Sequence, residues 1–488
     1  MENTTTNTVT DAIRVRFAPS PTGPLHVGGL RTALYDFLLA RRRGGAFILR
    51  IEDTDRSRYI PGSIETLIES LRWAGLQYEE GPDVGGPCGP YFQSERLPLY
   101  RAAADRLVAS GHAYPCFCTA ERLTAMREEQ TRKGLTARYD RACLALSKDE
   151  IAVRIASGAP SVIRLRIPGN ETIRISDIVR GEVEIASEIL DDQVLMKSDG
   201  FPTYHLAVVV DDHEMGITHV VRGEEWLSST PKHVLLYRYL GWALPYFAHL
   251  PLILGADRSK LSKRQADVAV TDYRNQGYFP EALINFVAFL GWNPGDDREI
   301  FSLEELTREF SLERVNKSGA IFNIEKLRWF NQQYMQRLPA ERLVAELRPL
   351  LEERGICGFD DAYLARVIDQ WRERVTFVRE IVERGGWFFT DPVEYEEATV
   401  KKRWTSTSGA LLARLVPEIA NLPVFDVAAL DAAIAAFADA EGIAKSDVIH
   451  PLRLACTGVG GGPGLYDLMA VLGREACVRR IRRAIEAL

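Results

Sequence analysis

The sequence has few cysteines, no long apolar run and no excess of positive charge. Its seven cysteines, an odd number spread over 488 residues, argue against a disulfide framework and predict a reducing compartment. No apolar run approaches the roughly 18 residues of a membrane-spanning helix. Residues 1–12 lack both the apolar core of a signal peptide and the arginines of a transit peptide. We therefore expect a disordered extension there and a cytoplasmic protein without a membrane partner.

The charge balance excludes one simple class of protein. The formal net charge is -7, which is not what a general nucleic-acid coat protein carries. An RNA-binding enzyme can still be acidic overall when its basic residues gather on one face, so composition leaves RNA binding open. With 46% apolar and 26% charged residues the chain has the composition of a globular protein, and its length predicts three or more domains.

One stretch near the start has a strand–turn–helix pattern. Residues 13–18 predict a short strand, the turn that follows is rich in proline, and apolar residues then recur at helical spacing from Leu30 to Leu38. This pattern puts His26, Gly28 and Gly29 where a strand leads into a helix N-terminus, with free backbone N–H groups. Such a junction binds phosphate, although many turns of this kind are only turns.

A second, basic loop lies far downstream. It follows the apolar run Leu250–Leu254 and contains Lys260, Ser262, Lys263 and Arg264. Alone, it would be read as a solvated charged face. Together with PLHVGG, however, it resembles the paired HIGH and KMSKS signatures of class I aminoacyl-tRNA synthetases. The longer run FAPSPTGPLHVGGLRTALYDFLLARRRGGAFILRIEDTD resembles the opening of bacterial-type glutamyl-tRNA synthetases, and the resemblance extends from about Arg14 to near the C-terminus.

This resemblance implies a two-step reaction carried out by a monomer. ATP with Mg²⁺ and L-glutamate would give glutamyl-adenylate and pyrophosphate, and the acyl group would then pass to the terminal ribose of tRNA(Glu). The residues it implies for catalysis are His26, Gly28, Gly29, Lys260 and Lys263. Those it implies for ATP are His26, Gly28, Gly29, Leu252, Ile253, Leu254 and Lys263. Such catalysis needs positioning and placed positive charge, and no protein nucleophile.

Recognition of glutamate requires cations for two carboxylates and an acceptor for the ammonium group. Arg16 and Arg222 suit the carboxylates and Glu52 suits the ammonium group. Without the resemblance, a strand-edge ion pair for Arg16 and a core position for Tyr204 would be the simpler interpretations. The residues implied for glutamate are Arg16, Ala18, Ser20, Glu52, Tyr204, Val208 and Arg222. Val208 stands where part of the family has an asparagine, so one amide contact is missing there.

Three clustered cysteines predict a metal site. Cys116, Cys118 and Cys143 suit a structural Zn²⁺, and the alternative is a site that keeps buried thiols without metal. Some glutamyl-type synthetases have a histidine two residues after the last cysteine, but that residue is Ala145 here. The resemblance implies Tyr139 as the fourth ligand, although a phenol, with a usual pKa of about 10, is a poor one.

The predicted fold class is α/β. It consists of a class I Rossmann-like catalytic core with an inserted α+β acceptor-binding domain, followed by an all-helical anticodon-binding region. The expected divisions are 13–95 and 201–258 for the core, 96–200 for the insertion, 259–330 for the KMSKS loop and stem-contact domain, and 331–488 for the helical region, with an inner boundary near 385–395. Within the core, Leu206–Val210 is expected to be a buried strand, as in a parallel sheet, and residues 228–240 a helix.

Several functions remain open at this stage. The enzyme could charge tRNA(Glu) alone or also tRNA(Gln). Shortened paralogues that attach glutamate to a tRNA base lack the helical region, and a non-catalytic RNA-binding paralogue would not need the lysine loop. RNA contacts are predicted at two groups of basic and aromatic residues, namely Lys401, Lys402, Arg403 and Trp404, and Arg372, Arg374 and Phe377.

Overall fold

The computed structural model describes residues 12–261 and 269–488. The described chain divides into two compact units. The first unit runs to Gln276 and also includes Leu283–Ile324, and the second consists of Gly277–Ala282 and Glu325–Leu488. None of the helices in the described ranges has the length and hydropathy needed to span a bilayer.

The first unit begins with the predicted strand, turn and helix, which a second strand follows. Strand β1 (Arg14–Phe17) pairs in parallel with β2 (Ala46–Leu49), and α1 (Val27–Arg42) connects them. The predicted apolar stripe of α1 is buried, including Leu30 and Leu34 at 0% exposure. Helix α2 (Ser63–Trp73) follows. The sequence therefore predicted this segment correctly, because its proline-rich turn and helical periodicity are local signals.

A second sheet continues the α/β core. Its strand order is β6-β5-β9-β8, where β5 and β8 are parallel to β9 and β5 is antiparallel to β6. Thr218, which directly precedes β8, joins this sheet to β1, because its backbone N–H donates to the carbonyl of Arg14. The bounds are β5 Thr172–Asp177, β6 Gly181–Ala186, β8 His219–Gly223 and β9 Tyr246–Leu250.

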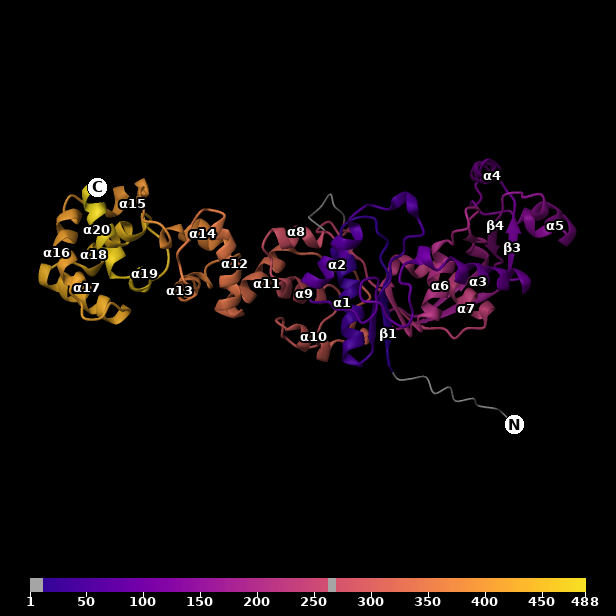
Figure 1. Cartoon of the computed structure of the whole chain (residues 1–488), viewed down its shortest axis with the longest axis horizontal. Coiled ribbons are helices and arrows are strands. Elements are labelled where there is room, and N and C mark those ends of the chain that lie inside the picture. Colours follow the sequence, from indigo (N-terminus) through magenta and orange to yellow (C-terminus); the bar gives the residue numbers. More distant parts are fainter. Residues whose placement is uncertain (1–11, 262–268) are drawn as a thin grey trace, which may run out of the picture. The chain divides into compact units, whose positions relative to one another are not determined.

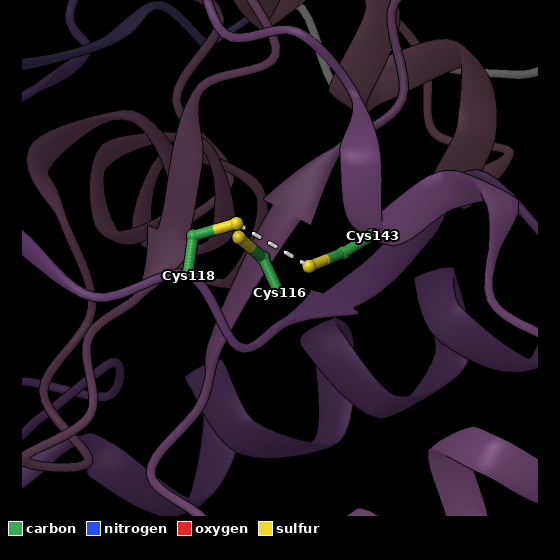
Figure 2. Close-up of side chains that lie close together, drawn as sticks. All are labelled: Cys116, Cys118 and Cys143. Atoms are coloured by element: carbon green, nitrogen blue, oxygen red, sulfur yellow. Dashed lines mark hydrogen bonds between the residues drawn. The ribbon is translucent and has the colours of Figure 1, made fainter. Parts of the chain in front are cut away.

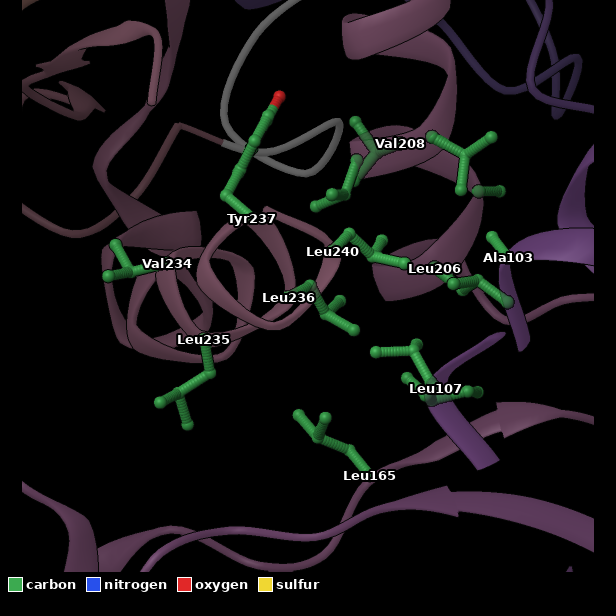
Figure 3. Packing of buried hydrophobic residues seen from close by; sticks show 14 of the residues in the cluster. Ala103, Leu107, Leu165, Leu206, Val208, Val234, Leu235, Leu236, Tyr237 and Leu240 are labelled. Atoms are coloured by element: carbon green, nitrogen blue, oxygen red, sulfur yellow. The ribbon is translucent and has the colours of Figure 1, made fainter. Parts of the chain in front are cut away.

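The run Leu206–Val210 is helical, so the predicted strand is wrong. It lies inside α6 (Tyr204–Glu214), which packs with α3 (Leu97–Ala109) and α7 (Thr230–Leu240) in one apolar core. Figure 3 shows Leu206 of α6 near Ala103 and Leu107 of α3. Because this helix is buried on nearly all sides, it has no polar face and hence no helical periodicity.

A separate sheet and two helices also lie between α3 and α6, within the range 96–200 that was predicted as the insertion. Strands β3, β4 and β7 form an antiparallel sheet, and Figure 1 shows α4 and α5 beside it. Their bounds are β3 Ala113–Cys116, α4 Ala120–Arg132, α5 Lys148–Ala156, β4 Val162–Leu165 and β7 Val194–Met196.

Later elements are β10 Ile253–Leu254, α8 Val270–Asn275, α9 Pro280–Ala288, α10 Leu303–Glu309 and β11 Ala320–Ile321. Short 3₁₀ turns are Arg56–Arg58, Gln93–Glu95, Ala142–Ala145, Ser187–Ile189, Glu224–Ser229, Leu312–Arg314 and Gly386–Phe388.

The second unit is helical, as predicted for the C-terminal region. Within the described chain β11 is the last strand, and the helices that follow are coloured orange to yellow in Figure 1. They are α11 Ile324–Arg337, α12 Ala340–Glu352, α13 Asp361–Trp371, α14 Arg379–Gly385, α15 Glu397–Arg403, α16 Ser408–Ala420, α17 Val427–Glu441, α18 Lys445–Thr457, α19 Leu465–Leu472 and α20 Arg474–Ala487.

One of the two predicted RNA-contact groups is altered by this packing. Phe377 is buried at 8% exposure, with its ring against Tyr278 at a centroid distance of 4.9 Å, so it offers no free face for a base. Lys401 and Lys402 on α15 are exposed, and Trp404 is half-buried at the end of that helix. The group around Lys401 therefore remains the better candidate of the two.

Candidate active site

A cavity of about 790 Å³ lies in the first unit, where β1, α1, β8 and the loop before Leu261 meet. Most residues predicted for catalysis, ATP and glutamate line it. These are Arg16, Ala18, Ser20, His26, Gly28, Gly29, Glu52, Tyr204, Arg222, Leu252, Ile253 and Lys260. Leu254 is not among the lining residues, and Val208 is buried in the apolar core at 1% exposure. Lys263 lies outside the described residues.

His26 begins helix α1 as its N-cap. Its Nδ1 accepts the backbone N–H of Gly28 at 2.9 Å, so this N–H, which we expected to be free, has a partner in the protein. A Cβ atom at Gly29 would lie 3.0 Å from Leu25 Cδ1 and 3.4 Å from Phe17 Cζ. A side chain at this position would require Leu25 to shift by a few tenths of an ångström, so Gly29 also lets the turn pack closely on β1.

The backbone at Leu252, Ile253 and Leu254 is also already hydrogen-bonded. The three carbonyls accept N–H groups from Ala320, Leu261 and Phe322, and Glu224 accepts the N–H of Leu252 at 2.8 Å. An adenine could share a carbonyl here, because each carbonyl oxygen has two lone pairs.

Buried charges form a chain behind the cavity. Asp212 of α6 accepts from Arg16 Nε at 2.9 Å and from Arg50 Nη1 at 2.8 Å, through the same carboxylate oxygen. Arg50 also reaches Glu52, with Nη2 and Oε1 3.3 Å apart. Arg16, Arg50, Glu52 and Asp212 are all less than 10% exposed. The charge of Arg16 is thus compensated inside the protein, and Arg50 connects Asp212 to the cavity-lining carboxyl of Glu52.

The electrostatic environment gives Glu52 and Asp212 opposite pKa shifts. Burial raises the pKa of Glu52 to about 7, although Arg50 and Arg16 oppose the shift. Burial would also raise the pKa of Asp212, but Arg16 and Arg50 outweigh it and hold that pKa below its usual value. Glu52 therefore titrates near neutral pH while Asp212 stays ionised.

Arg222 of β8 has a different set of partners. Its Nη1 donates to Tyr204 Oη at 2.9 Å and to His233 Nδ1 at 3.3 Å, and its Nε donates to His249 Nε2 at 3.1 Å. Its Nη2 donates to Thr230 Oγ1 at 2.8 Å and approaches the Trp226 carbonyl at 3.5 Å. Within the described ranges no carboxylate lies within 4.0 Å of this guanidinium.

Lys260, the described lysine of the basic loop, lies at the rim of the cavity. Its Nζ is 3.4 Å from Glu225 Oε1, and both side chains are largely exposed. An exposed pair at this distance is weak, so Lys260 can exchange Glu225 for an anionic ligand at little cost.

The three cysteines of the insertion come together as predicted. Their Sγ atoms lie within 4.8 Å of one another, and Figure 2 shows the contact between Cys118 and Cys143 at 3.5 Å. The Tyr139 hydroxyl lies 3.3 Å from Cys116 Sγ and 3.4 Å from Cys118 Sγ. Thiols around a tetrahedral Zn²⁺ would be roughly 3.8 Å apart, so three thiols and one phenol fit such an ion.

The sequence analysis did not predict several residues of the site. Asp212, Arg50, His233 and His249 are buried and hydrogen-bonded to the residues predicted to bind substrate. The one local signal for these residues was the pair of adjacent aspartates, Asp211 and Asp212, directly after an apolar run. Buried charged side chains usually have partners, so this pair could have indicated a buried ion pair.

Comparison with known proteins places the chain in a family. A family model described as "tRNA synthetases class I (E and Q), catalytic domain" matches residues 12–329, and a model described as "Anticodon binding domain" matches residues 342–485. The chain belongs to the class I tRNA synthetases of the E and Q type. This agrees with the predicted class I core followed by a helical anticodon-binding region.

Relatives of this class I synthetase match it over nearly its full length. The glutamate–tRNA ligases of Chloroherpeton thalassium and Chlorobium luteolum are each 50% identical over 98% of this chain and 98% of the relative. A crystal structure of a glutamate tRNA ligase from Elizabethkingia meningosepticum in complex with its amino acid has a TM-score of 0.92 and 42% identity. It covers 98% of this chain and 100% of that one.

Proposed function

We propose that this class I synthetase is a glutamate–tRNA ligase that activates L-glutamate with ATP and transfers it to the 3'-terminal ribose of tRNA(Glu). The observation that carries the proposal is the 50% identity to proteins named glutamate–tRNA ligase over 98% of both chains. The cavity supports it, because it combines two arginines, a buried carboxyl and a helix N-terminus.

Glutamate would bind between Arg222, Arg16 and Glu52. Arg222 offers a charge that no described carboxylate neutralises, and the Tyr204 hydroxyl, which accepts from it, can donate its own hydrogen to a substrate carboxylate. Arg16 is already paired with Asp212, so its attraction for a second carboxylate is weaker. Glu52 would accept from the ammonium group, while Ser20 and Ala18 complete the wall of the cavity.

The chemical step requires placed positive charge near the phosphates. His26 and the start of α1 would hold them on one side, and Lys260, with Lys263 of the same motif, on the other. Leu252 and Ile253 would border the adenine. Mg²⁺ accompanies ATP and lowers the negative charge of the phosphates. The carboxylate oxygen of glutamate attacks the α-phosphorus and pyrophosphate leaves, so no protein nucleophile is needed.

The cysteine cluster would hold a structural Zn²⁺. Cys116, Cys118 and Cys143 would supply three thiolates and Tyr139 the fourth ligand, and none of the four lines the cavity. The metal would connect the end of β3 to the segment around Cys143 and so stabilise the insertion. A monomeric state and a cytoplasmic location are also part of the proposal, and light scattering of the purified protein tests the first.

Attachment of labelled glutamate to separate tRNA(Glu) and tRNA(Gln) transcripts, with ATP and Mg²⁺, tests the activity. Charging of tRNA(Glu) alone identifies a discriminating ligase, and charging of both identifies a non-discriminating one. Omission of ATP is the control for adventitious attachment. If the folded protein charges neither transcript, the ligase proposal is wrong and a non-catalytic RNA-binding role replaces it.

A further inference from the structure

A buried hydrogen-bonded chain leads from the β5–β6 hairpin of the second sheet to Arg222 in the cavity. Asp177 Oδ2 lies 2.6 Å from His249 Nδ1, and His249 Nε2 lies 3.1 Å from Arg222 Nε. The side chains of Asp177 and His249 are 0% exposed, and Arg222 is 6% exposed. Neither Asp177 nor His249 lines the cavity, so both would act on substrate only through Arg222.

The partners at the two ends fix which nitrogen of His249 carries the proton. Burial favours a protonated Asp177, but its hydrogen bonds to His249 and to backbone N–H groups outweigh this and hold its pKa below the usual value, so its carboxylate accepts. An arginine Nε–H can only donate, and the Thr230 hydroxyl, 3.2 Å from His249 Nε2, is able to donate to it as well. His249 must therefore be the neutral Nδ1–H tautomer, with Nε2 as an acceptor. Burial lowers the pKa of His249 despite the contact with Asp177, which agrees with a neutral ring.

Asp177 is itself held by the backbone. Its Oδ1 accepts the N–H groups of Val179 at 3.0 Å, Arg180 at 2.8 Å and His249 at 3.3 Å. Three backbone bonds leave this carboxylate little freedom, so its second oxygen presents a fixed acceptor to the imidazole.

The second imidazole beside Arg222 is neutral as well. His233 Nδ1 lies 3.3 Å from Arg222 Nη1 and must accept, so its Nε2 carries the proton and donates to His205 Nδ1 at 3.1 Å. Burial, and then Arg222, hold the pKa of His233 well below its usual value. Arg222 is thus oriented entirely by neutral acceptors, whereas Arg16 in the same cavity is oriented by the carboxylate of Asp212.

We propose that Asp177 and His249 are positioning residues that orient Arg222 without neutralising it, so that its charge remains available to a carboxylate of the substrate. The imidazole of His249 is essential because it separates the carboxylate of Asp177 from the guanidinium of Arg222. A carboxylate bonded directly to Arg222 would orient it equally well but would cancel the charge that distinguishes glutamate from a neutral amino acid. The inference rests on the proposed function, since it assumes that the anionic ligand is glutamate.

The decisive variant is Asp177→Asn. The amide oxygen can keep the three backbone bonds, but the amide nitrogen must then donate to His249 Nδ1. This reverses the tautomer and turns an N–H of His249 towards the N–H of Arg222. We expect the KM for glutamate to rise about tenfold or more while the KM for ATP stays within about twofold. A KM for glutamate within about twofold of wild type in folded Asp177→Asn overturns the proposal.

A pair of variants at His249 separates positioning from packing. His249→Gln places an amide oxygen near the position of Nε2 and can still accept from Arg222, whereas His249→Asn can bond Asp177 but is too short to reach Arg222. We expect the KM for glutamate to rise in His249→Asn and to recover in part in His249→Gln. If both variants raise the KM for glutamate and the KM for ATP by the same factor, His249 has a structural role only. His219→Gln, on the neighbouring strand β8, is the matched control.

The tautomer can be measured without any activity. Imidazole ¹⁵N chemical shifts of the full-length protein, assigned with His249→Asn, should show a protonated Nδ1 and an unprotonated Nε2 at His249. A protonated Nε2 overturns the proposal even if the variants fail to fold. If the wild-type protein does not charge tRNA, the proposed function is contradicted. The ¹⁵N measurement then still decides whether Asp177 and His249 orient Arg222 as proposed.

Discussion

Arg16 of β1 and Asp212 of α6 form a buried ion pair of 2.9 Å although 196 residues separate them in the chain. Both side chains are 4% exposed, and Asp212 holds Arg50 through the same oxygen. The pair connects the first strand of the core to the helix that carries Tyr204. Several properties of the site depend on it.

Asp212→Asn should destabilise the first unit. The amide keeps an acceptor for Arg16 and Arg50 but removes the charge that the two arginines share, so that Arg16 loses its paired carboxylate while Arg50 keeps Glu52 and Asp211. Breaking a buried pair in this way costs about 3 kcal/mol. We expect a clearly lower melting temperature by calorimetry. Glu184→Gln, which breaks the exposed pair with Arg174, should leave the melting temperature unchanged. Equal melting temperatures for the two variants would contradict this assignment.

Glu52 should make glutamate binding depend on pH near neutrality. Its pKa is raised to about 7 by burial, so the neutral form predominates below that pH and cannot accept from an ammonium group as a carboxylate does. We expect kcat/KM for glutamate to rise with pH through about 7 and then to level off. In Glu52→Gln, kcat/KM for glutamate should be lower than in the wild type at all pH values and should not rise with pH through this range. A flat wild-type profile between about pH 6 and 8.5 would show that Glu52 does not bind the ammonium group.

His26 should have two separable roles. Asparagine at this position can still accept the Gly28 N–H as an N-cap, whereas alanine cannot, so His26→Ala should lose about 1 kcal/mol of stability and His26→Asn little. Both variants remove the imidazole from the cavity, and both should lower kcat by about 100-fold or more. Retention of wild-type kcat in His26→Asn would restrict His26 to capping the helix.

The cysteine cluster predicts that the purified protein contains about one Zn²⁺ per chain, measured by plasma mass spectrometry. Tyr139→Phe removes only the hydroxyl and should lower zinc retention on dialysis against a chelator, because one of the four ligands is lost. Cys357→Ser, at an exposed cysteine outside the cluster, is the control and should retain the metal. Wild-type protein free of zinc after purification in zinc-containing buffer would indicate a cluster of buried thiols only.

The sequence predicted the elements whose signals are local. Strand β1, helix α1, helix α7 and the helical second unit follow from turn residues, caps and periodicity. Helix α6 was mistaken for a strand because its central residues, Leu206–Val210, are all apolar and fully buried. Apolar residues recur at helical spacing only when one face of the helix contacts water. A helix that is buried on all sides therefore shows no such periodicity in its sequence.

The motifs by themselves determined which family the chain resembles, because a strand–turn–helix junction and a lysine loop are contiguous in sequence. The resemblance then implied site residues of which most line the cavity, whereas Leu254 and Val208 do not. The electrostatic character of those residues was decided by the tertiary structure. Nothing local distinguishes Arg16 from Arg222, yet one is paired with Asp212 and the other is surrounded by neutral imidazoles and hydroxyls. Charge compensation depends on distances of a few ångströms between side chains far apart in the chain, and only the fold sets those distances.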